Sequence, residues 1–74
     1  MELAEKLKEL RLERGETQQA VAKLLNVKQN TYSQYETGQR QLPLEALKNL
    51  ARFYEVSTDY ILGLTEIEIP YPKK

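Results

Sequence analysis

The segment from Lys28 to Arg40 has the sequence KQNTYSQYETGQR and is rich in side-chain amides. An amide carries both hydrogen-bond donors and an acceptor, so Gln or Asn can pair with adenine at two points, and Lys can donate to guanine. Charged residues would solvate a helix surface equally well, and glutamines on an exposed helix can also serve only as a solvated face. The chemistry that this segment favours is hydrogen-bonded recognition of another molecule, with base edges as the candidate target.

The composition excludes most enzyme chemistry. The 74 residues contain no cysteine and no histidine, which removes disulfides, Cys- or His-based zinc sites and the commonest general base. No set of residues offers a nucleophile beside a base. We therefore expect no enzymatic activity, no metal, no cofactor and no small-molecule ligand.

The charges are balanced overall but unevenly distributed. Lys plus Arg and Asp plus Glu number 11 each, so the net charge is zero, which weighs against nucleic-acid binding. Residues 17–41, however, contain Lys23, Lys28 and Arg40 against Glu36 alone, and this is the only net positive segment. With no apolar run of membrane-spanning length and no signal-peptide pattern, we expect a soluble, cytoplasmic protein with no membrane partner.

Apolar periodicity and helix-end signals predict an all-α chain. The predicted helices cover about residues 2–14, 18–25, 29–36, 43–54 and 58–62. They make one domain over residues 1–64, because a chain of this length holds one domain at most and no linker interrupts it. Residues 65–74, TEIEIPYPKK, alternate apolar and polar residues around two prolines. They predict a short extended tail that is loose, or that packs on the domain or on a second subunit.

The apolar residues also predict which side of each helix is buried. The expected core residues are Ala20, Val21, Leu24 and Leu25 in the second helix, Tyr32 and Tyr35 in the third, and Leu44, Leu47, Leu50, Ala51 and Tyr54 in the fourth. Thr17 is a suitable N-cap for the second helix, and Ser57 for the fifth.

The second and third helices are joined by three or four residues around NVK, which forces the sharp crossing of a helix-turn-helix. From Leu7 to Leu64 the chain resembles the DNA-binding domain of phage repressor and Cro proteins, the XRE family. The matching pieces are LKELRLERG, TQQAVAKLLNV, TYSQYETGQR, LEALKNLA and VSTDYILGL, in the family's order and spacing. The resemblance implies a compact five-helix, lambda-repressor-like bundle. It also implies sequence-specific binding of double-stranded DNA, usually as a two-fold dimer on a palindromic operator.

Within that framework, the third helix is expected to lie in the major groove with its first residues at the base edges. The expected base contacts are Lys28, Gln29 and Asn30, with Gln34 one turn further on. The expected backbone contacts are Gln18 at the start of the second helix, Thr31, and Gln39 and Arg40 in the following loop. The resemblance also implies a structural ion pair between Arg11 and Glu36.

Three features depart from the family pattern. Lys28 stands where Ser or Thr usually caps the recognition helix, Asn26 and Glu55 replace turn glycines, and Tyr32 replaces a branched aliphatic residue. Asn tolerates a left-handed conformation, whereas Glu55 must take it at a cost or avoid it. Tyr32 needs a larger space, or its hydroxyl must reach solvent or a partner.

A repressor-type regulator is the leading interpretation, and an antitoxin or adaptor that binds mainly protein through the same fold is the alternative. Zero net charge and the apolar tail are compatible with the alternative. A homodimer, at least on DNA, is a hypothesis. Its candidate contacts are Tyr60, Ile61, Leu64, Ile67 and Ile69.

Overall fold

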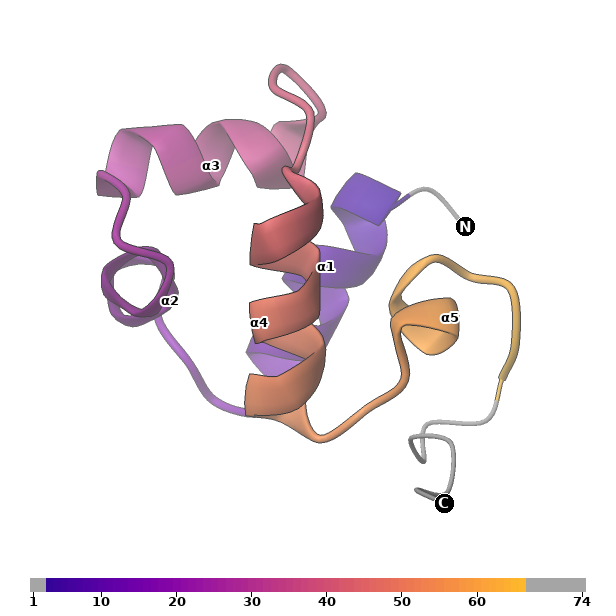
Figure 1. The fold of residues 1–74 in the computed structure, drawn as a ribbon. Helices are drawn as coiled ribbons and strands as arrows, with labels where there is room; N and C mark the ends of the chain where they lie inside the picture. The colour runs from indigo at the N-terminus through magenta and orange to yellow at the C-terminus, as the bar shows by residue number, and fades with distance from the viewer. Residues whose placement is uncertain (1–2, 67–74) are drawn as a thin grey trace.

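The computed structural model describes residues 3–66, and these form five helices joined by short turns (Figure 1). The helices are α1 (Leu3–Glu13), α2 (Gln18–Leu24), α3 (Gln29–Thr37), α4 (Leu44–Tyr54) and α5 (Thr58–Ile61). The prediction of an all-α, five-helix fold is confirmed, and each helix ends within one residue of its predicted boundary.

Figure 1 shows how the helices cross. α2 is seen end-on while α3 lies lengthwise beside it, so the two axes are steeply inclined, as in a helix-turn-helix. α1 and α4 lie between this pair and α5, which is on the opposite side of the molecule. α3 packs against both α1 and α2, so its orientation is fixed from two sides.

Side-chain caps and left-handed residues set the helix ends. Thr17 Oγ1 accepts a hydrogen bond from the Ala20 amide at 3.0 Å, and Ser57 Oγ accepts one from the Tyr60 amide at 3.0 Å. Both are N-caps of the kind that the sequence predicts. α3 ends at Gly38, whose φ of 80° is left-handed.

Two non-glycine residues also adopt the left-handed conformation. Asn26 has φ 59° after α2, and Glu55 has φ 56° at the end of α4. Glu55 therefore takes the unfavourable conformation rather than avoiding it. Its backbone amide donates to carbonyls of the last turn of α4, so the cap itself is formed.

The core lies between α1, α3, α4 and α5, with one face of α2 closing it. Its buried apolar residues are Leu7, Leu10, Val21, Ala22, Tyr32, Tyr35, Leu47, Leu50, Ala51, Tyr54, Val56, Tyr60 and Ile61. Tyr32 is fully buried and meets Tyr35 edge-to-face, with ring centroids 6.2 Å apart. The prediction that these two tyrosines share a buried face is confirmed.

Three of the predicted core positions were wrong. Ala20 is exposed and Leu24 is 42% exposed, while Ala22 takes the buried position between them. α2 is apolar on more than one face, so periodicity did not identify the buried one. Leu44 is 70% exposed because it is the first residue of α4, a turn before the helix meets the core.

The predicted tail at 65–74 lies almost entirely outside the described residues, which reach Glu66. Within residues 3–66, no helix is both long enough and apolar enough to cross a membrane.

Candidate nucleic-acid interface

The first turn of α3 lies at the molecular surface. Lys28, Gln29 and Asn30 are exposed, and Gln34 is partly exposed one turn later. Lys28 is the N-cap residue with extended backbone, and its side chain makes no capping hydrogen bond. The four residues expected to contact bases are therefore on one accessible helix, with polar side chains free to meet another molecule at its start.

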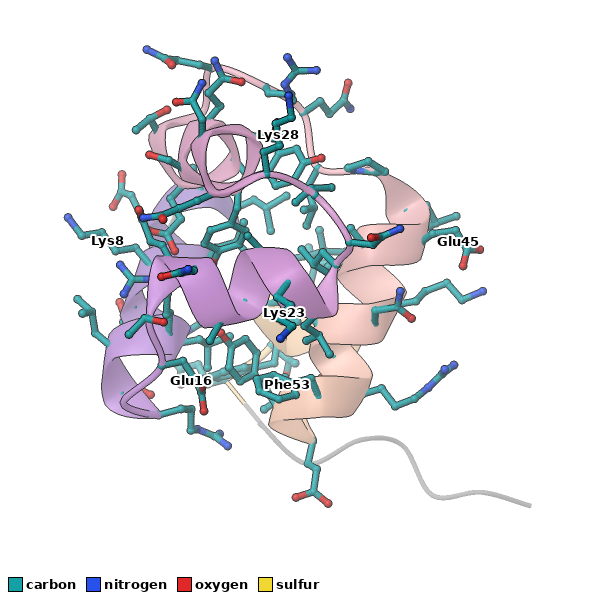
Figure 2. The ribbon with its side chains drawn as sticks, turned by 90° about the vertical axis from the view of Figure 1, so that its left-hand side faces the viewer. Lys8, Glu16, Lys23, Lys28, Glu45 and Phe53 are labelled. Atoms are coloured by element: carbon teal, nitrogen blue, oxygen red, sulfur yellow. The ribbon has the colours of Figure 1, made fainter. Side chains whose placement is uncertain are left out.

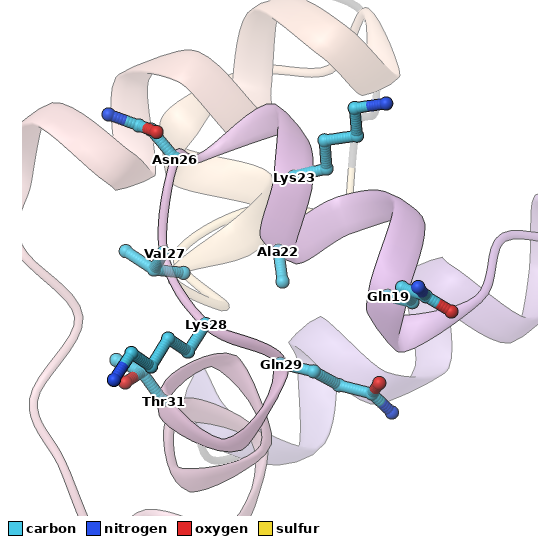
Figure 3. A pocket seen from close by; sticks show the side chains of 8 residues that line it. All are labelled: Gln19, Ala22, Lys23, Asn26, Val27, Lys28, Gln29 and Thr31. Atoms are coloured by element: carbon cyan, nitrogen blue, oxygen red, sulfur yellow. The ribbon is translucent and has the colours of Figure 1, made fainter.

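An open groove runs between α2 and the start of α3, and Figure 3 shows the residues that line it. The lining residues are Gln19, Ala22, Lys23, Asn26, Val27, Lys28, Gln29 and Thr31. Lys23 and Lys28 lie on the same side of the molecule in Figure 2. The groove therefore combines two cations with the amides of the turn.

The only acidic residue of residues 17–41 is removed from the surface. Glu36 is 7% exposed, whereas Lys23, Lys28 and Arg40 are all exposed. The surface of α2, α3 and the next loop therefore displays cations and amides without a carboxylate. Residues 17–41 therefore expose three cations and no carboxylate, although the whole chain carries no net charge.

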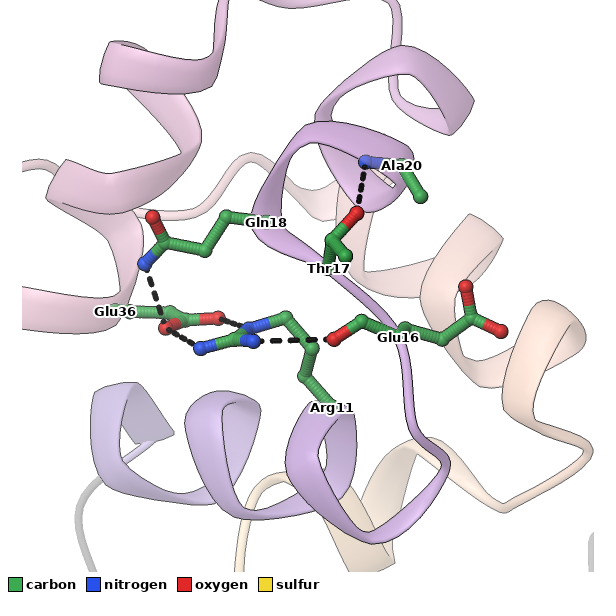
Figure 4. A network of polar contacts seen from close by, with 6 residues as sticks. All are labelled: Arg11, Glu16, Thr17, Gln18, Ala20 and Glu36. Atoms are coloured by element: carbon green, nitrogen blue, oxygen red, sulfur yellow. Dashed lines mark hydrogen bonds and ion pairs between the residues drawn. The ribbon is translucent and has the colours of Figure 1, made fainter.

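Glu36 is held in a buried polar network below this surface (Figure 4). Arg11 donates to it through two nitrogens, Nε to Oε2 at 2.7 Å and Nη2 to Oε1 at 3.2 Å. Arg11 Nη1 also donates to the Glu16 carbonyl at 3.1 Å. The pair that the resemblance implied is thus formed with bidentate geometry, and it ties α3 to α1.

The network shifts the pKa values of groups in and around it. Burial alone would raise the pKa of Glu36, but the donors that face it, Arg11 first and then Tyr32 and Gln18, outweigh burial and hold that pKa below its usual value. Burial, with the nearby Glu36 carboxylate, raises the pKa of Tyr54 to about 12. The same two causes raise the pKa of Tyr32.

The Tyr32 hydroxyl is buried rather than turned to solvent. Among residues 3–66 it makes no hydrogen bond of good geometry, but it lies beside the Glu36 carboxylate. The Tyr54 hydroxyl is also buried without such a hydrogen bond among these residues. The negative charge of Glu36 contributes to the raised pKa of both hydroxyls.

A family model described as Helix-turn-helix matches residues 7–61. This chain belongs to the helix-turn-helix family. The match agrees with the resemblance to phage repressor and Cro proteins that the sequence motifs indicated.

Several transcriptional regulators are similar to this chain. ImmR of Bacillus subtilis is 42% identical over 67 residues, which are 90% of this chain and 53% of ImmR. The cryptic phage CTXphi transcriptional repressor RstR of Vibrio cholerae is 38% identical over 64 residues, 86% of this chain and 58% of RstR. The transcriptional activator BcrR of Enterococcus faecalis is 34% identical over 67 residues, 90% of this chain and 33% of BcrR.

Among solved structures, a transcriptional regulator from Listeria innocua matches with a TM-score of 0.80 at 30% identity. The match covers 99% of this chain and 62% of that one. This chain spans about half the length of the curated relatives ImmR and RstR.

Gln18, at the start of the first helix of the helix-turn-helix, joins the Glu36 network. Its Nε2 donates to Glu36 Oε1 at 3.1 Å (Figure 4). An amide nitrogen carries two hydrogens, so one remains for an outside acceptor. The expected phosphate contact is therefore compatible with this bond, and Glu36 fixes the direction from which it can be made.

A second link lies at the other end of α3. Arg40 Nε donates to Gln34 Oε1 at 3.0 Å, which joins an expected backbone contact to an expected base contact. Sequence reasoning missed this pair because it depends on the left-handed turn at Gly38. Gln39, beside Arg40, is exposed, and Thr31 is partly exposed.

The candidate dimer contacts of this helix-turn-helix chain differ in accessibility. Ile61 is fully buried, and Tyr60 is 9% exposed with Lys6 Nζ 4.0 Å above its ring. These two side chains serve the core of one chain and are not available for the subunit contact expected of them. Leu64 is 74% exposed and Leu62, which sequence reasoning did not select, is 39% exposed. Ile67 and Ile69 lie outside the described residues.

Proposed function

We propose that this chain is a cytoplasmic, sequence-specific double-stranded DNA-binding regulator of transcription. The observation that carries the proposal is the accessible surface of α2, α3 and the following loop. It presents amides and cations while its single carboxylate is buried and paired. Family membership and the names of the similar proteins support the same function.

In this proposal α3 enters the major groove, and its first turn contacts base edges. Gln29 and Asn30 are exposed at that end, and either amide can pair with adenine in a bidentate manner. Lys28 can donate to guanine from the N-cap position. Gln34 contacts a base one helical turn further along the groove.

Backbone contacts would flank the base contacts and fix the position of α3. Gln18 offers its remaining amide hydrogen at the positive end of α2, where phosphates bind favourably. Arg40 and Gln39 approach from the loop after α3, and Thr31 adds a hydroxyl. Such contacts supply affinity, whereas the base contacts supply discrimination.

We further propose that the chain acts as a repressor and binds a palindromic operator as a homodimer. A single domain of this size makes a small DNA interface, and a two-fold pair contacts half-sites about one helical turn apart. RstR, whose name describes a transcriptional repressor, supports the sign of regulation.

Salt dependence tests DNA binding before any operator is known. Each phosphate contact releases counterions, so the logarithm of the binding constant should fall linearly with the logarithm of salt concentration. Fluorescence anisotropy with a labelled duplex should show a slope that decreases in magnitude by about 1 in Arg40→Ala. Lys48→Ala, which removes an exposed cation from α4, is the matched control and should leave the slope unchanged. Binding that does not respond to salt would contradict the proposal.

The second candidate function is a protein-interaction module, an antitoxin or adaptor on the same fold. The exposed Leu62 and Leu64 after α5 favour it, together with the zero net charge. In that case the chain would not bind duplex DNA at any salt concentration. Substitutions in α3 would leave the binding of a protein partner unchanged.

A further inference from the structure

Gln34 is held by a residue beyond the end of its own helix. The backbone amide of Arg40 donates to the Gln34 carbonyl at 3.2 Å, and Arg40 Nε donates to Gln34 Oε1 at 3.0 Å. Thr37 Oγ1 donates to the same carbonyl at 3.2 Å. Gly38, with φ 80°, turns the chain back so that Arg40 lies against the helix. The two hydrogen bonds from Arg40 hold it and Gln34 in place relative to each other.

The bond to Arg40 determines which end of the Gln34 amide faces outward. A guanidinium can only donate hydrogen bonds, so the amide must turn its oxygen toward Arg40. The amino group then points away from Arg40. A glutamine without such a neighbour could rotate and present either end to a base.

We propose that Arg40 determines which base Gln34 selects, an inference that rests on the proposed DNA-binding function. Arg40 Nε holds the amide, and the terminal nitrogens of the same guanidinium remain able to donate to a phosphate, since arginine carries five N–H groups. Arg40 is thus a positioning residue. It contacts the DNA backbone, yet it contributes to sequence preference through Gln34.

The orientation of the amide favours adenine over guanine. An amide oxygen has two lone pairs, so Gln34 Oε1 can accept from the adenine amino group while it accepts from Arg40, and the Gln34 amino group can donate to adenine N7. Guanine presents two acceptors, O6 and N7, so only the amino group can pair with it and the oriented oxygen meets no donor. Without Arg40 the amide can rotate and present its amino group to either base, so the preference for adenine weakens.

The test uses the whole chain and a random-sequence duplex library. Sequence selection with the wild type and with Gln34→Ala identifies the base pair whose preference depends on Gln34. Affinities for duplexes that differ only at that pair are then measured by fluorescence anisotropy. The variants are Arg40→Ala, Gln34→Ala and the double variant. Arg52→Ala, which removes an exposed arginine from the last turn of α4, is the matched control. Circular dichroism checks that each variant is folded.

We expect the wild type and Arg52→Ala to prefer A·T over G·C at this pair by roughly fivefold or more, the lower end of what a good base contact supplies. Arg40→Ala should reduce that preference, beyond any uniform loss of affinity. In the Gln34→Ala background, Arg40→Ala should change affinity without changing preference.

Three results would overturn the inference alone. They are a preference unchanged by Arg40→Ala, a wild-type preference for G·C at this pair, or base preferences that are all unaffected by Gln34→Ala. A wild-type chain that enriches no sequence would overturn the proposed function and this inference with it.

Discussion

At the scale of single residues, Glu36 links the fold to the candidate interface. Its carboxylate accepts hydrogen bonds from Arg11 in α1 and from Gln18 in α2. It therefore sets the position of α3 relative to both helices, and it directs the Gln18 amide. Its burial also leaves the surface of α2, α3 and the following loop without a negative charge. One ion pair thus contributes both to the orientation of α3 and to the sign of the charge on its surface.

Removing one member of this pair should cost far more than removing both. Arg11→Met leaves Glu36 buried without its main partner, so we expect the free energy of unfolding to fall by about 3–5 kcal/mol. Arg11→Met combined with Glu36→Met should recover most of that loss. Urea denaturation measures all three values.

The control for this prediction is Lys48→Met, which breaks the exposed pair with Glu45 and should have little effect. A double variant that is as unstable as Arg11→Met would show that the penalty does not come from the uncompensated carboxylate.

The depressed pKa of Glu36 predicts loss of stability in acid. In the unfolded chain this carboxyl titrates near its ordinary 4.5, whereas the folded state holds its pKa lower. The stabilisation is therefore complete above pH 4.5 and is lost as the pH falls from there through the lower folded pKa. Urea denaturation between about pH 6 and pH 3 should show a shallower decline in Glu36→Gln than in the wild type. Equal declines in both proteins would contradict the prediction.

At the scale of the elements, the helices were predictable because caps and apolar spacing are local signals. Thr17 and Ser57 each form the predicted cap, and Tyr32 and Tyr35 share the predicted face. The buried face of α2 was not predictable, since AVAKLL offers apolar residues in several directions. Ile61 appeared available to a partner because a four-residue helix has no clear apolar face of its own.

Part of the candidate site could likewise be predicted from the sequence, and part depends on the folded structure. The surface positions of Gln29 and Asn30 follow from the helical period and from the family motif. The bond from Arg40 to Gln34 does not, because it requires the left-handed turn at Gly38 to bring a loop residue back to the helix. The Gln18 contact with Glu36 likewise needs α2 and α3 to be packed before it can form.

The end of α4 offers a stabilising substitution. Glu55 holds φ 56°, a conformation that costs a non-glycine residue about 1–2 kcal/mol. Glycine removes this strain but loses more backbone entropy on folding, so Glu55→Gly should raise the free energy of unfolding by about 0.5–1 kcal/mol. Urea denaturation measures the gain.

Asn26→Gly, at φ 59°, is the control for the Glu55 prediction and should give a smaller gain, because asparagine tolerates this region. A loss of stability in Glu55→Gly would mean that the Glu55 side chain makes a compensating contact.

At the scale of the whole molecule, a neutral chain can still bind a polyanion if its charges are segregated. Among residues 3–66, every acid except the buried Glu36 lies outside residues 17–41, while the region around α3 exposes cations and amides. At physiological salt, charges more than about 8 Å from a phosphate are strongly screened, so the local surface outweighs the distant acids. Zero net charge is therefore compatible with the proposed function.

We predict that two chains bind one operator as a homodimer. Sedimentation with a duplex that carries two half-sites one helical turn apart should show two chains per duplex. Leu64→Ser should weaken the second binding event, and Leu12→Ser, a similarly exposed leucine on α1, should not. A single chain per duplex at high micromolar protein would exclude the homodimer.

DNA binding by α3 can be tested by titrating isotope-labelled protein with a generic duplex at low salt and following the amide chemical shifts. We predict shifts concentrated at Gln18, Gln29, Asn30, Gln34 and Arg40, reversed when salt is added. If no amide in this region shifts even at low salt, α3 is not a DNA-binding surface, and the protein-interaction function takes its place.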